Sequence, residues 1–183
     1  MNLSADYYLI SNYLYMNGYR ELRQESTVFN VLRVNAFKTF KVGRHWNLHA
    51  EVYLQQKTGG AQLNMPLLYT RNRFMYEGNL GFKNLNIAMG IEARYHTPYK
   101  ADGYSPVLGK YFYQDSVKIS NRPDISALIH FRIRSFKAFV RAENLNTANF
   151  IGGFQFNNNN VPAPEYLTPG LILRFGIYWS FVN

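Results

Sequence analysis

The feature that most constrains this chain is a strict alternation of apolar and other side chains along extended runs. In the last run, one set of alternate positions holds only apolar residues, whereas the other set is mostly polar or small. The first set is Leu171, Leu173, Phe175, Ile177, Trp179 and Phe181, and the second is Ile172, Arg174, Gly176, Tyr178 and Ser180. A period of two residues is typical of a β-strand with two unlike faces. We therefore predict an all-β chain.

The same pattern recurs along the sequence and predicts eight strands. Their approximate ranges are 5–16, 26–41, 45–57, 66–82, 84–97, 123–134, 136–145 and 168–182. Most of them reach or exceed the roughly 9–11 residues that a tilted strand needs to cross a bilayer. Strands of soluble domains are usually nearer about 5–6 residues long. The lengths therefore favour strands that span a membrane.

The connections between the predicted strands alternate between short and long. Tight turns are expected at 42–44, 83–84 and 134–135, and long connections at 17–25, 57–65, 98–122 and 146–167. Bacterial outer-membrane barrels have short periplasmic turns and longer outward loops. We therefore predict an antiparallel transmembrane β-barrel of about eight strands in the bacterial outer membrane. Residues 1–183 would form one barrel domain, or one C-terminal segment of a larger barrel.

The composition agrees with this interpretation. Hydrophobic residues make up 47% of the chain, yet the mean hydropathy is −0.28, which means that apolar and polar residues are interleaved. No apolar stretch reaches the roughly 18 residues of a transmembrane helix. The absence of cysteine excludes a disulfide framework. The net charge of +9 is compatible with binding of nucleic acid, an anionic membrane or anionic solutes. Most basic residues sit singly within the predicted strands, so we expect no nucleic-acid partner.

Three segments in the second half of the chain resemble a known family. The first is residues 95–115, YHTPYKADGYSPVLGKYFYQD, a Tyr-rich segment in which an aromatic pair precedes Gln114. The second is residues 121–146, NRPDISALIHFRIRSFKAFVRAENLN, and the third is the closing run RFGIYWSFVN. These segments resemble the late barrel of the putative porin family of Bacteroidetes, and the resemblance covers the whole chain.

The resemblance implies a porin that is longer than this chain. Members of that family are substantially longer and carry a signal peptide, which implies that this sequence is the C-terminal part of a larger barrel. The N-terminus MNLSADYYLI lacks the basic and apolar regions of a signal peptide. We therefore expect a processed chain, a segment prepared for expression, or the C-terminal part of something longer.

Basic residues dominate the face that the alternation turns inward, where Lys and Arg outnumber the acids. Unpaired buried charges cost several kcal/mol each, so this excess favours a wide, hydrated lumen. A lumen lined by one sign of charge favours the opposite ion, here an anion. The predicted pore-lining residues are Arg71, Arg73, Arg94, Arg132, Arg134, Arg141 and Arg174. The alternative is that these arginines pair with acids from strands that this sequence does not contain.

Two groups of aromatic residues have predicted places in this topology. Trp46 opens the third strand and Trp179 ends the eighth, so both would lie at the periplasmic rim, where an interfacial girdle gathers tryptophan. The alternative is two core tryptophans of a soluble barrel.

The Asn run 157–160 is interpreted as a loop tip. One long loop is expected on the extracellular side, with its aromatic residues packing on one another or folding into the mouth: Tyr99, Tyr104, Tyr111, Phe112 and Tyr113.

The sequence gives only weak signals for catalysis or metal binding. His45 and His49 are four strand residues apart, about 13 Å, which is too far to share a metal. Ser126 and His130 are separated in the same way, and no Gly-x-Ser-x-Gly motif occurs. The loop acids, Asp102 among them, are interpreted as solvated charges. We expect no enzyme activity, no cofactor and no metal.

Three functions remain open at this level. The leading one is a porin that lets small, anionic solutes diffuse passively. The second is a structural or scaffold barrel subunit of a larger outer-membrane assembly, and the third is a soluble ligand-binding barrel of the lipocalin type. The expected partners are outer-membrane lipid, small solutes, and other outer-membrane proteins or the rest of the protein's own barrel. Conductance separates the first function from the second, and detergent dependence separates the third from both.

Overall fold

The computed structural model describes residues 1–149, 155–156 and 160–180. Within this part of the chain the regular structure is β, apart from one short 3-10 turn, η1 (Leu145–Thr147). No helix in the described part is long and apolar enough to cross a membrane, a finding that does not bear on proteins that cross with strands. The prediction of an all-β chain is confirmed.

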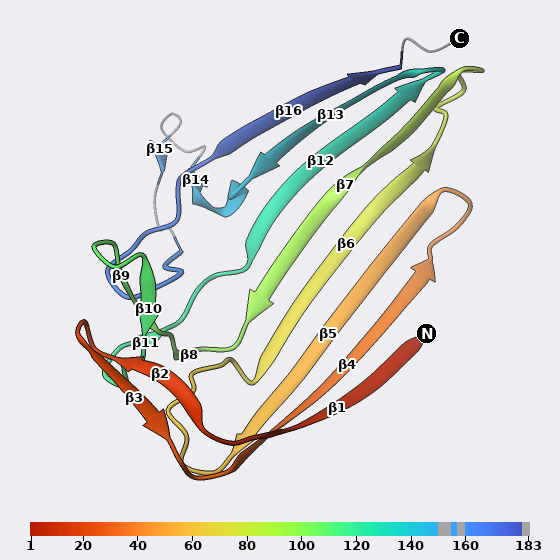
Figure 1. Cartoon of the computed structure of the whole chain (residues 1–183). Helices are drawn as coiled ribbons and strands as arrows, with labels where there is room; N and C mark the ends of the chain where they lie inside the picture. Colours follow the sequence, from red (N-terminus) through yellow and green to blue (C-terminus); the bar gives the residue numbers. More distant parts are fainter. Residues whose placement is uncertain (150–154, 157–159, 181–183) are drawn as a thin grey trace.

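Eight long strands form one antiparallel sheet in which the strands follow one another in chain order (Figure 1). They are β1 (Asn2–Ile10), β4 (Phe29–Lys41), β5 (Trp46–Thr58), β6 (Leu68–Gly78), β7 (Leu85–His96), β12 (Asp124–Ile133), β13 (Phe136–Glu143) and β16 (Ile172–Trp179). The sheet curves into a wall and does not close, so that β1 and β16 form its two edges. Eight antiparallel strands agree with the predicted barrel fold, although the sheet of the described residues is open.

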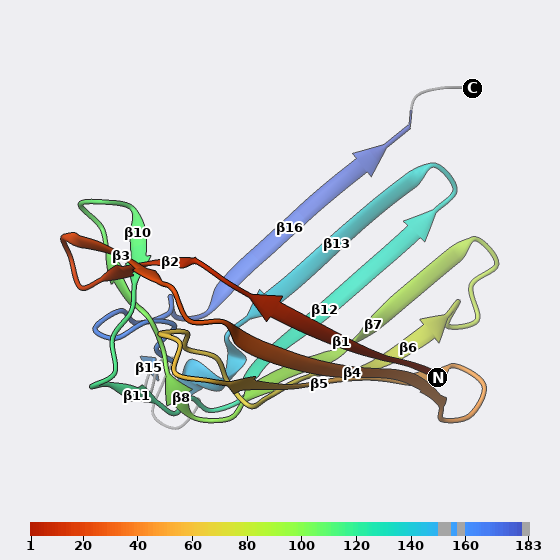
Figure 2. The same cartoon turned by 60° about the horizontal axis from the view of Figure 1, so that its bottom comes forward.

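The remaining strands are short and lie outside this sheet. They are β2 (Tyr13–Asn17), β3 (Glu21–Glu25), β8 (Tyr99–Lys100), β9 (Gly103–Ser105), β10 (Lys110–Phe112), β11 (Lys118–Ile119), β14 (Ala148–Asn149) and β15 (Gln155–Phe156). They pair as four two-stranded ribbons. Figure 2 shows that these ribbons gather at one end of the long strands.

The two ends of the sheet differ sharply. At one end, which we call the hairpin end, the long strands are joined by short turns at 42–45, 79–84 and 134–135. At the other end, which we call the loop end, the connections are long (Figure 2). These long connections span residues 11–28, 59–67, 97–123 and 144–171. The predicted alternation of short and long connections is therefore confirmed.

The two faces of the sheet differ as well. On the outer face, large apolar side chains are exposed: Phe175 is 79% exposed and Ile91 53%. The inner face carries the polar alternate positions, such as Arg73 opposite Glu92. An apolar face this large and this exposed is unstable in water, because soluble proteins rarely expose contiguous apolar patches of more than a few hundred Å². The outer face is suited to contact with lipid.

The first predicted strand, 5–16, is wrong beyond Ile10. Asn12 adopts a left-handed backbone conformation with φ of 54°, which ends the extended run. The chain then turns away, and β2 pairs with β3 in a separate ribbon rather than with β4. Asn tolerates this conformation better than most residues, because its short side chain can bond locally. The alternation within β2 is real, but it belongs to a loop ribbon.

Two other boundaries of the predicted strands also change. Residues 79–82, predicted as strand, form a turn in which Leu80 and Gly81 have positive φ of 49° and 85°. The eighth strand, predicted over 168–182, begins only at Ile172 and ends at Trp179. Phe181 lies outside the described residues.

Both tryptophans lie at the hairpin end on the outer face. Trp46 stacks on Phe74 with 4.8 Å between ring centroids, and Trp179 meets Phe136 edge-on at 6.0 Å. Both remain exposed, at 38% and 57%. Their exposure does not fit a buried core, whereas a shared level on an apolar face fits an interface with lipid headgroups. The interfacial girdle itself stays a prediction.

Replacing Ile129 with Arg tests the assignment of the faces, because Ile129 lies in the middle of β12 on the outer face. A basic residue at the bilayer midplane costs about 2–4 kcal/mol. We expect this loss of unfolding free energy in urea titrations of the protein folded in lipid vesicles. The matched control is His130→Arg, its inward-facing neighbour, which should cost far less. Equal losses for the two variants would contradict the assignment.

Candidate functional site

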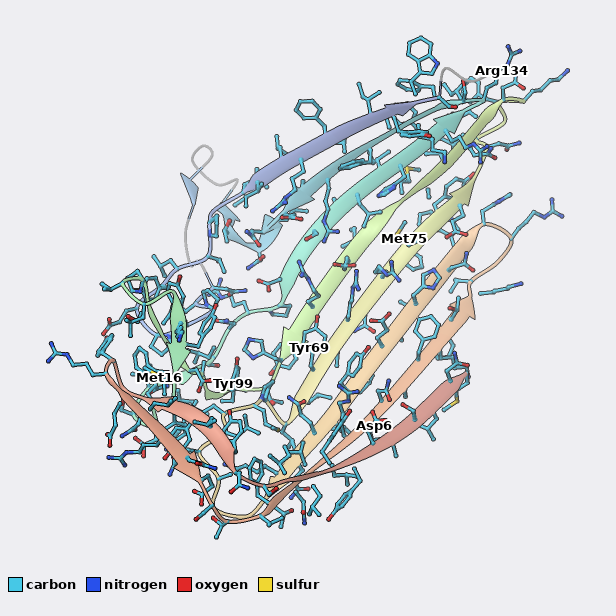
Figure 3. All side chains as sticks on the ribbon, in the orientation of Figure 1. Asp6, Met16, Tyr69, Met75, Tyr99 and Arg134 are labelled. Atoms are coloured by element: carbon cyan, nitrogen blue, oxygen red, sulfur yellow. The ribbon has the colours of Figure 1, made fainter. Side chains whose placement is uncertain are left out.

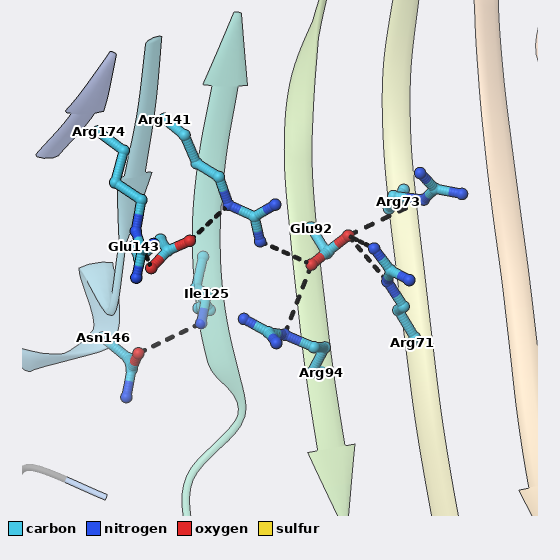
Figure 4. Close-up of polar contacts among 9 residues, drawn as sticks. All are labelled: Arg71, Arg73, Glu92, Arg94, Ile125, Arg141, Glu143, Asn146 and Arg174. Atoms are coloured by element: carbon cyan, nitrogen blue, oxygen red, sulfur yellow. Dashed lines mark hydrogen bonds and ion pairs between the residues drawn. The ribbon is translucent and has the colours of Figure 1, made fainter. Parts of the chain in front are cut away.

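The inner face contains one nearly inaccessible charge, the carboxylate of Glu92 on β7, which is 1% exposed. Arg71 on β6 donates from Nε and Nη2 to its Oε2 at 2.9 and 2.8 Å. Arg141 on β13 donates from Nη2 to the other oxygen, Oε1, at 3.1 Å. Figure 4 shows these side chains converging from both sides of β7. Glu92 is thus held between two strands that are not neighbours of each other.

Two further guanidinium groups lie within ion-pair distance of Glu92. Arg94 Nε is 3.5 Å from its Oε1, and Arg73 Nε is 3.9 Å from its Oε2 (Figure 4). The network continues through Glu143, whose oxygens lie 3.0 Å from Arg141 Nε and 3.1 Å from Arg174 Nε. We call this network the arginine ladder. It consists of Arg71, Arg73, Arg94, Arg141 and Arg174 with Glu92 and Glu143.

Strand register produces the ladder. Arg73 is the direct partner of Glu92 between β6 and β7, and Arg71 is the partner of Arg94. Between β13 and β16, Arg141 lies opposite Arg174. Directly opposed side chains on one face of a sheet are about 4.5–5.5 Å apart at Cβ, and diagonal ones remain within reach of long side chains. The register therefore brings arginines from four strands to one level of the inner face.

The charges of the ladder do not balance. Five guanidinium groups share two carboxylates, so every arginine has a partner but the ladder carries a net surplus of three positive charges. The carboxylate of Glu92 is compensated, which is the condition for retaining a buried charge. The arginines are only partly covered, with side-chain exposures from 26% to 61%. Their surplus charge faces the space in front of the inner face.

The structure places the seven predicted wall arginines in two groups. Five of them form the arginine ladder. Arg132 lies nearer the hairpin end, and its Nε donates to the carbonyl oxygen of Arg134 at 3.2 Å. Arg134 itself is exposed in the turn between β12 and β13, with φ of 51°, so it lies at the rim and not on the wall. A pore-lining role for any of these residues stays a prediction.

Sequence reasoning predicted acids on the inward face but missed that Glu92 lies at the centre of the ladder. It also missed Asp6, which accepts from Arg33 Nη2 at 3.0 Å across β1 and β4. Period two shows which side chains share a face, whereas the partner of each one depends on register. Arg33 and every arginine of the ladder therefore contact an acid of this chain.

The long connections lock together at the loop end. The amide of Tyr113 donates to the carbonyl oxygen of Met16 at 2.8 Å, and this bond joins the first and third long connections. Asn64, in the second connection, donates from Nδ2 to Asp102 at 2.9 Å and to the carbonyl oxygen of Gln114 at 2.7 Å. Figure 3 shows Met16 and Tyr99 at this end and Arg134 at the opposite one. We call this assembly of long connections the loop cluster.

The fourth long connection joins the loop cluster through Asn160. Asn160 is 4% exposed, donates to the carbonyl oxygen of Arg122 at 2.9 Å, and accepts from the Arg122 amide at 3.2 Å. It also bonds Asp124. The interpretation of 157–160 as a loop tip is therefore wrong for Asn160, because its side chain is buried and bonds both backbone groups of Arg122. Residues 157–159 lie outside the described part of the chain.

Each of the five loop aromatics packs against another ring, and Tyr104 and Tyr111 pack against each other. Tyr104 lies 5.1 Å from Tyr111 between ring centroids, and Phe112 lies 4.6 Å from Tyr19 of the first connection. Tyr113 meets Tyr15 at 6.0 Å, and Tyr99 meets His96 at 5.3 Å. The rings thus connect separate loops. An extracellular position for this end stays a prediction.

Asp102 is half-buried within the loop cluster, not solvated as the sequence suggested. Burial raises the pKa of its carboxyl above the ordinary value, and the hydrogen bond from Asn64 offsets part of this rise. Burial also raises the pKa of the neighbouring Tyr99 phenol, with a further contribution from the charge of Asp102. Among the described residues, no three His, Asp or Glu side chains gather in a way that could hold a metal ion.

Comparison with known proteins gives one family match. A family model described as Putative porin matches residues 1–183, the whole chain. A search of curated proteins found no significant match. A search of solved structures found none either.

Replacing Glu92 with Gln should destabilise the fold, because it leaves four guanidinium groups close together without their shared carboxylate. Breaking a buried pair costs about 3–5 kcal/mol, and partial hydration of the arginines favours the lower end. Unfolding in urea from lipid vesicles measures the loss. The control is Glu77→Gln, an exposed acid of the same face, which should change stability by no more than about 0.5 kcal/mol. A loss no larger than that of the control would contradict the central role of Glu92.

Replacing Asp102 with Asn should protect the loop cluster at neutral pH. Because the folded loop raises the pKa of this acid, it holds the proton more tightly than the unfolded chain, so stability falls as pH rises through that pKa. Asn keeps an acceptor for Asn64 and removes the charge. We expect slower protease cleavage within 97–123 at neutral pH, and little difference in acid. Asp115→Asn, at an exposed position of the same loop, should change neither rate.

Proposed function

The chain belongs to the Putative porin family over its whole length, and on that premise we make the following proposal. We propose that the chain forms part of the wall of an outer-membrane β-barrel through which small anionic solutes diffuse. The surplus charge of the arginine ladder is the observation that carries this proposal. The ladder leaves a net surplus of three positive charges on the inner face of the sheet, which would face the lumen. In a hydrated channel such charges attract mobile anions and repel cations.

The open sheet supports a wide channel. In the described sheet, β1 pairs only with β4, and β16 pairs only with β13. In lipid every strand needs partners on both sides, because water is not available to satisfy its backbone groups. We propose that further strands, from the rest of the protein's own barrel or from another outer-membrane protein, complete the wall. A barrel of more than eight strands leaves room for water, whereas one of eight is filled by side chains.

The orientation follows from the connections. The short turns lie at one end and the loop cluster at the other. Outer-membrane barrels place short turns in the periplasm and long loops outside the cell. We therefore propose that the loop cluster, with Tyr104, Tyr111 and Phe112, faces the exterior, and that lipid contacts the outer face. The proposed transport contains no catalytic step.

One observation favours a second function, that of a structural barrel subunit. The loop cluster ties the first long connection, after β1, to the third, after β7, although three strands of the sheet lie between β1 and β7. Loops that reach across a wall in this way narrow its mouth. A scaffold barrel of a larger assembly would not need an open mouth, so conductance separates the two functions.

The reversal potential across a salt gradient tests anion selectivity. We expect the complete protein in a planar bilayer to conduct and to prefer anions. Arg73→Gln combined with Arg174→Gln should lower the anion-to-cation permeability ratio toward one, because it removes two positive charges from the ladder. Arg73 makes the longest contact with Glu92, and Arg174 is the most exposed arginine of the ladder. Their replacement leaves the bonds of Arg71 and Arg141 to Glu92 in place.

The matched control is Arg44→Gln combined with Lys83→Gln, which removes two positive charges from exposed turns of the hairpin end. This control should leave the permeability ratio close to that of the unaltered protein. Cation selectivity, or a ratio that the Arg73 and Arg174 replacements do not change, would contradict the proposed selectivity. A protein that inserts but does not conduct would support the scaffold function.

A further inference from the structure

A second basic site lies on the inner face, away from the arginine ladder. It is a hollow of about 640 Å³ near the hairpin end, between β6 and β16. Its lining includes His130, Arg132, Lys137, Phe139, Gly176 and Tyr178. A volume of this size is in the range of about 300–1,000 Å³ that accommodates small organic ligands. No residue of this lining belongs to the ladder, so the hollow requires a separate explanation.

The floor of the hollow is flat and apolar. Phe139 on β13 lies directly opposite Gly176 on β16, and its ring extends across the glycine. A Cβ atom at Gly176 would come within 2.4 Å of the Phe139 ring, so only glycine permits this position of the ring. The His130 ring stacks on the same phenyl group, at 5.8 Å between centroids and 28° between planes. These rings provide a surface on which a planar group can stack.

The edge of the hollow is basic. Arg132 is held by its bond to the carbonyl oxygen of Arg134 at 3.2 Å. Lys137 lies opposite Arg132 between β12 and β13, and its Nζ sits 5.5 Å from the centroid of the Tyr178 ring. The only acid in the lining is Glu77, on the far side at β6. Two adjacent cations beside a stacking surface match a ligand with an anionic group attached to an aromatic ring.

The hollow would survive completion of the barrel. A strand that pairs with β16 would do so through backbone groups, and its side chains would point to one face or the other. Tyr178 and Gly176 point to the inner face and therefore remain on the lumen side. Solutes that pass along the wall would meet this surface.

We propose that this hollow binds small aromatic carboxylates, with the ring stacked over Phe139 and the carboxylate between Arg132 and Lys137. The proposal rests on the proposed function, which it makes specific: the anions that this channel serves include ones with a planar apolar body. The arginine ladder supplies charge alone, whereas the hollow supplies charge next to an aromatic floor.

The first test is direct binding, which does not require conduction. The complete protein in lipid nanodiscs is dialysed against 2-naphthoate, and empty nanodiscs give the background. We expect saturable binding of 2-naphthoate and much weaker binding of decahydro-2-naphthoate, which has the same charge but no flat ring. Equal affinity for the two probes, or no saturable binding of either, would overturn the proposal.

Variants then locate the site. Arg132→Gln combined with Lys137→Gln should weaken 2-naphthoate binding by about tenfold or more, because bonds to charged groups are the stronger ones. Phe139→Leu should weaken 2-naphthoate and bring it level with the saturated analogue. The matched control, Arg44→Gln with Lys83→Gln, removes the same charge from the same end outside the hollow and should bind normally. Unchanged binding in the Arg132 and Lys137 variant would place the probe elsewhere and refute the assignment.

Conductance separates this proposal from the proposed function. If the protein conducts, 2-naphthoate added on the hairpin side should reduce the chloride current, and the Arg132 and Lys137 variant should resist this block. If the protein does not conduct but still binds 2-naphthoate through these residues, the site stands and the diffusion function fails. If the protein conducts but does not bind 2-naphthoate through these residues, the diffusion function stands and the proposed binding site fails.

Discussion

Backbone hydrogen bonding between neighbouring strands is the constraint on which the rest of this structure depends. Once each strand is paired, its register is fixed, and register decides which inward side chains meet. Arg73 reaches Glu92 because their backbones are partners, and Arg141 and Arg174, which are also partners, both reach Glu143. A slip of one residue would move a whole set of side chains to the other face. In this sheet such a slip would move guanidinium groups to the apolar outer face. The charged inner face and the apolar outer face therefore both favour the same pairing.

The sequence predicted the sheet well because its signals are local. Alternation identified eight strands, and the spacing of turn residues identified which connections are short. The prediction of the first strand was wrong at its end, because Tyr13–Asn17 shows the same alternation as Asn2–Ile10. What removes that segment from the sheet is the left-handed backbone at Asn12 and its pairing with Glu21–Glu25. Pairing with a distant segment cannot be read from periodicity alone.

The site was predictable only in part, for a related reason. Period two placed Arg71, Arg94 and Arg141 on one face, but not around a common partner. Their convergence on Glu92 needs the registers of several strand pairs at once. The loop cluster was less accessible still, since Asn160 bonds residues 36 to 38 positions away, through contacts that no local pattern announces. Long-range contacts among loops depend on tertiary geometry that the strands must first establish.

The contact between Met16 and Tyr113 gives the loop cluster a mechanical role. The two residues follow β1 and β7, and β4, β5 and β6 lie between these strands in the sheet. A curved wall joined in this way resembles an arc held by its chord. The arc cannot flatten unless the chord lengthens, so this bond at the loop end limits how far this part of the sheet can flatten. A change in the length of these two loops would then alter the curvature of the sheet without changing any residue of its long strands.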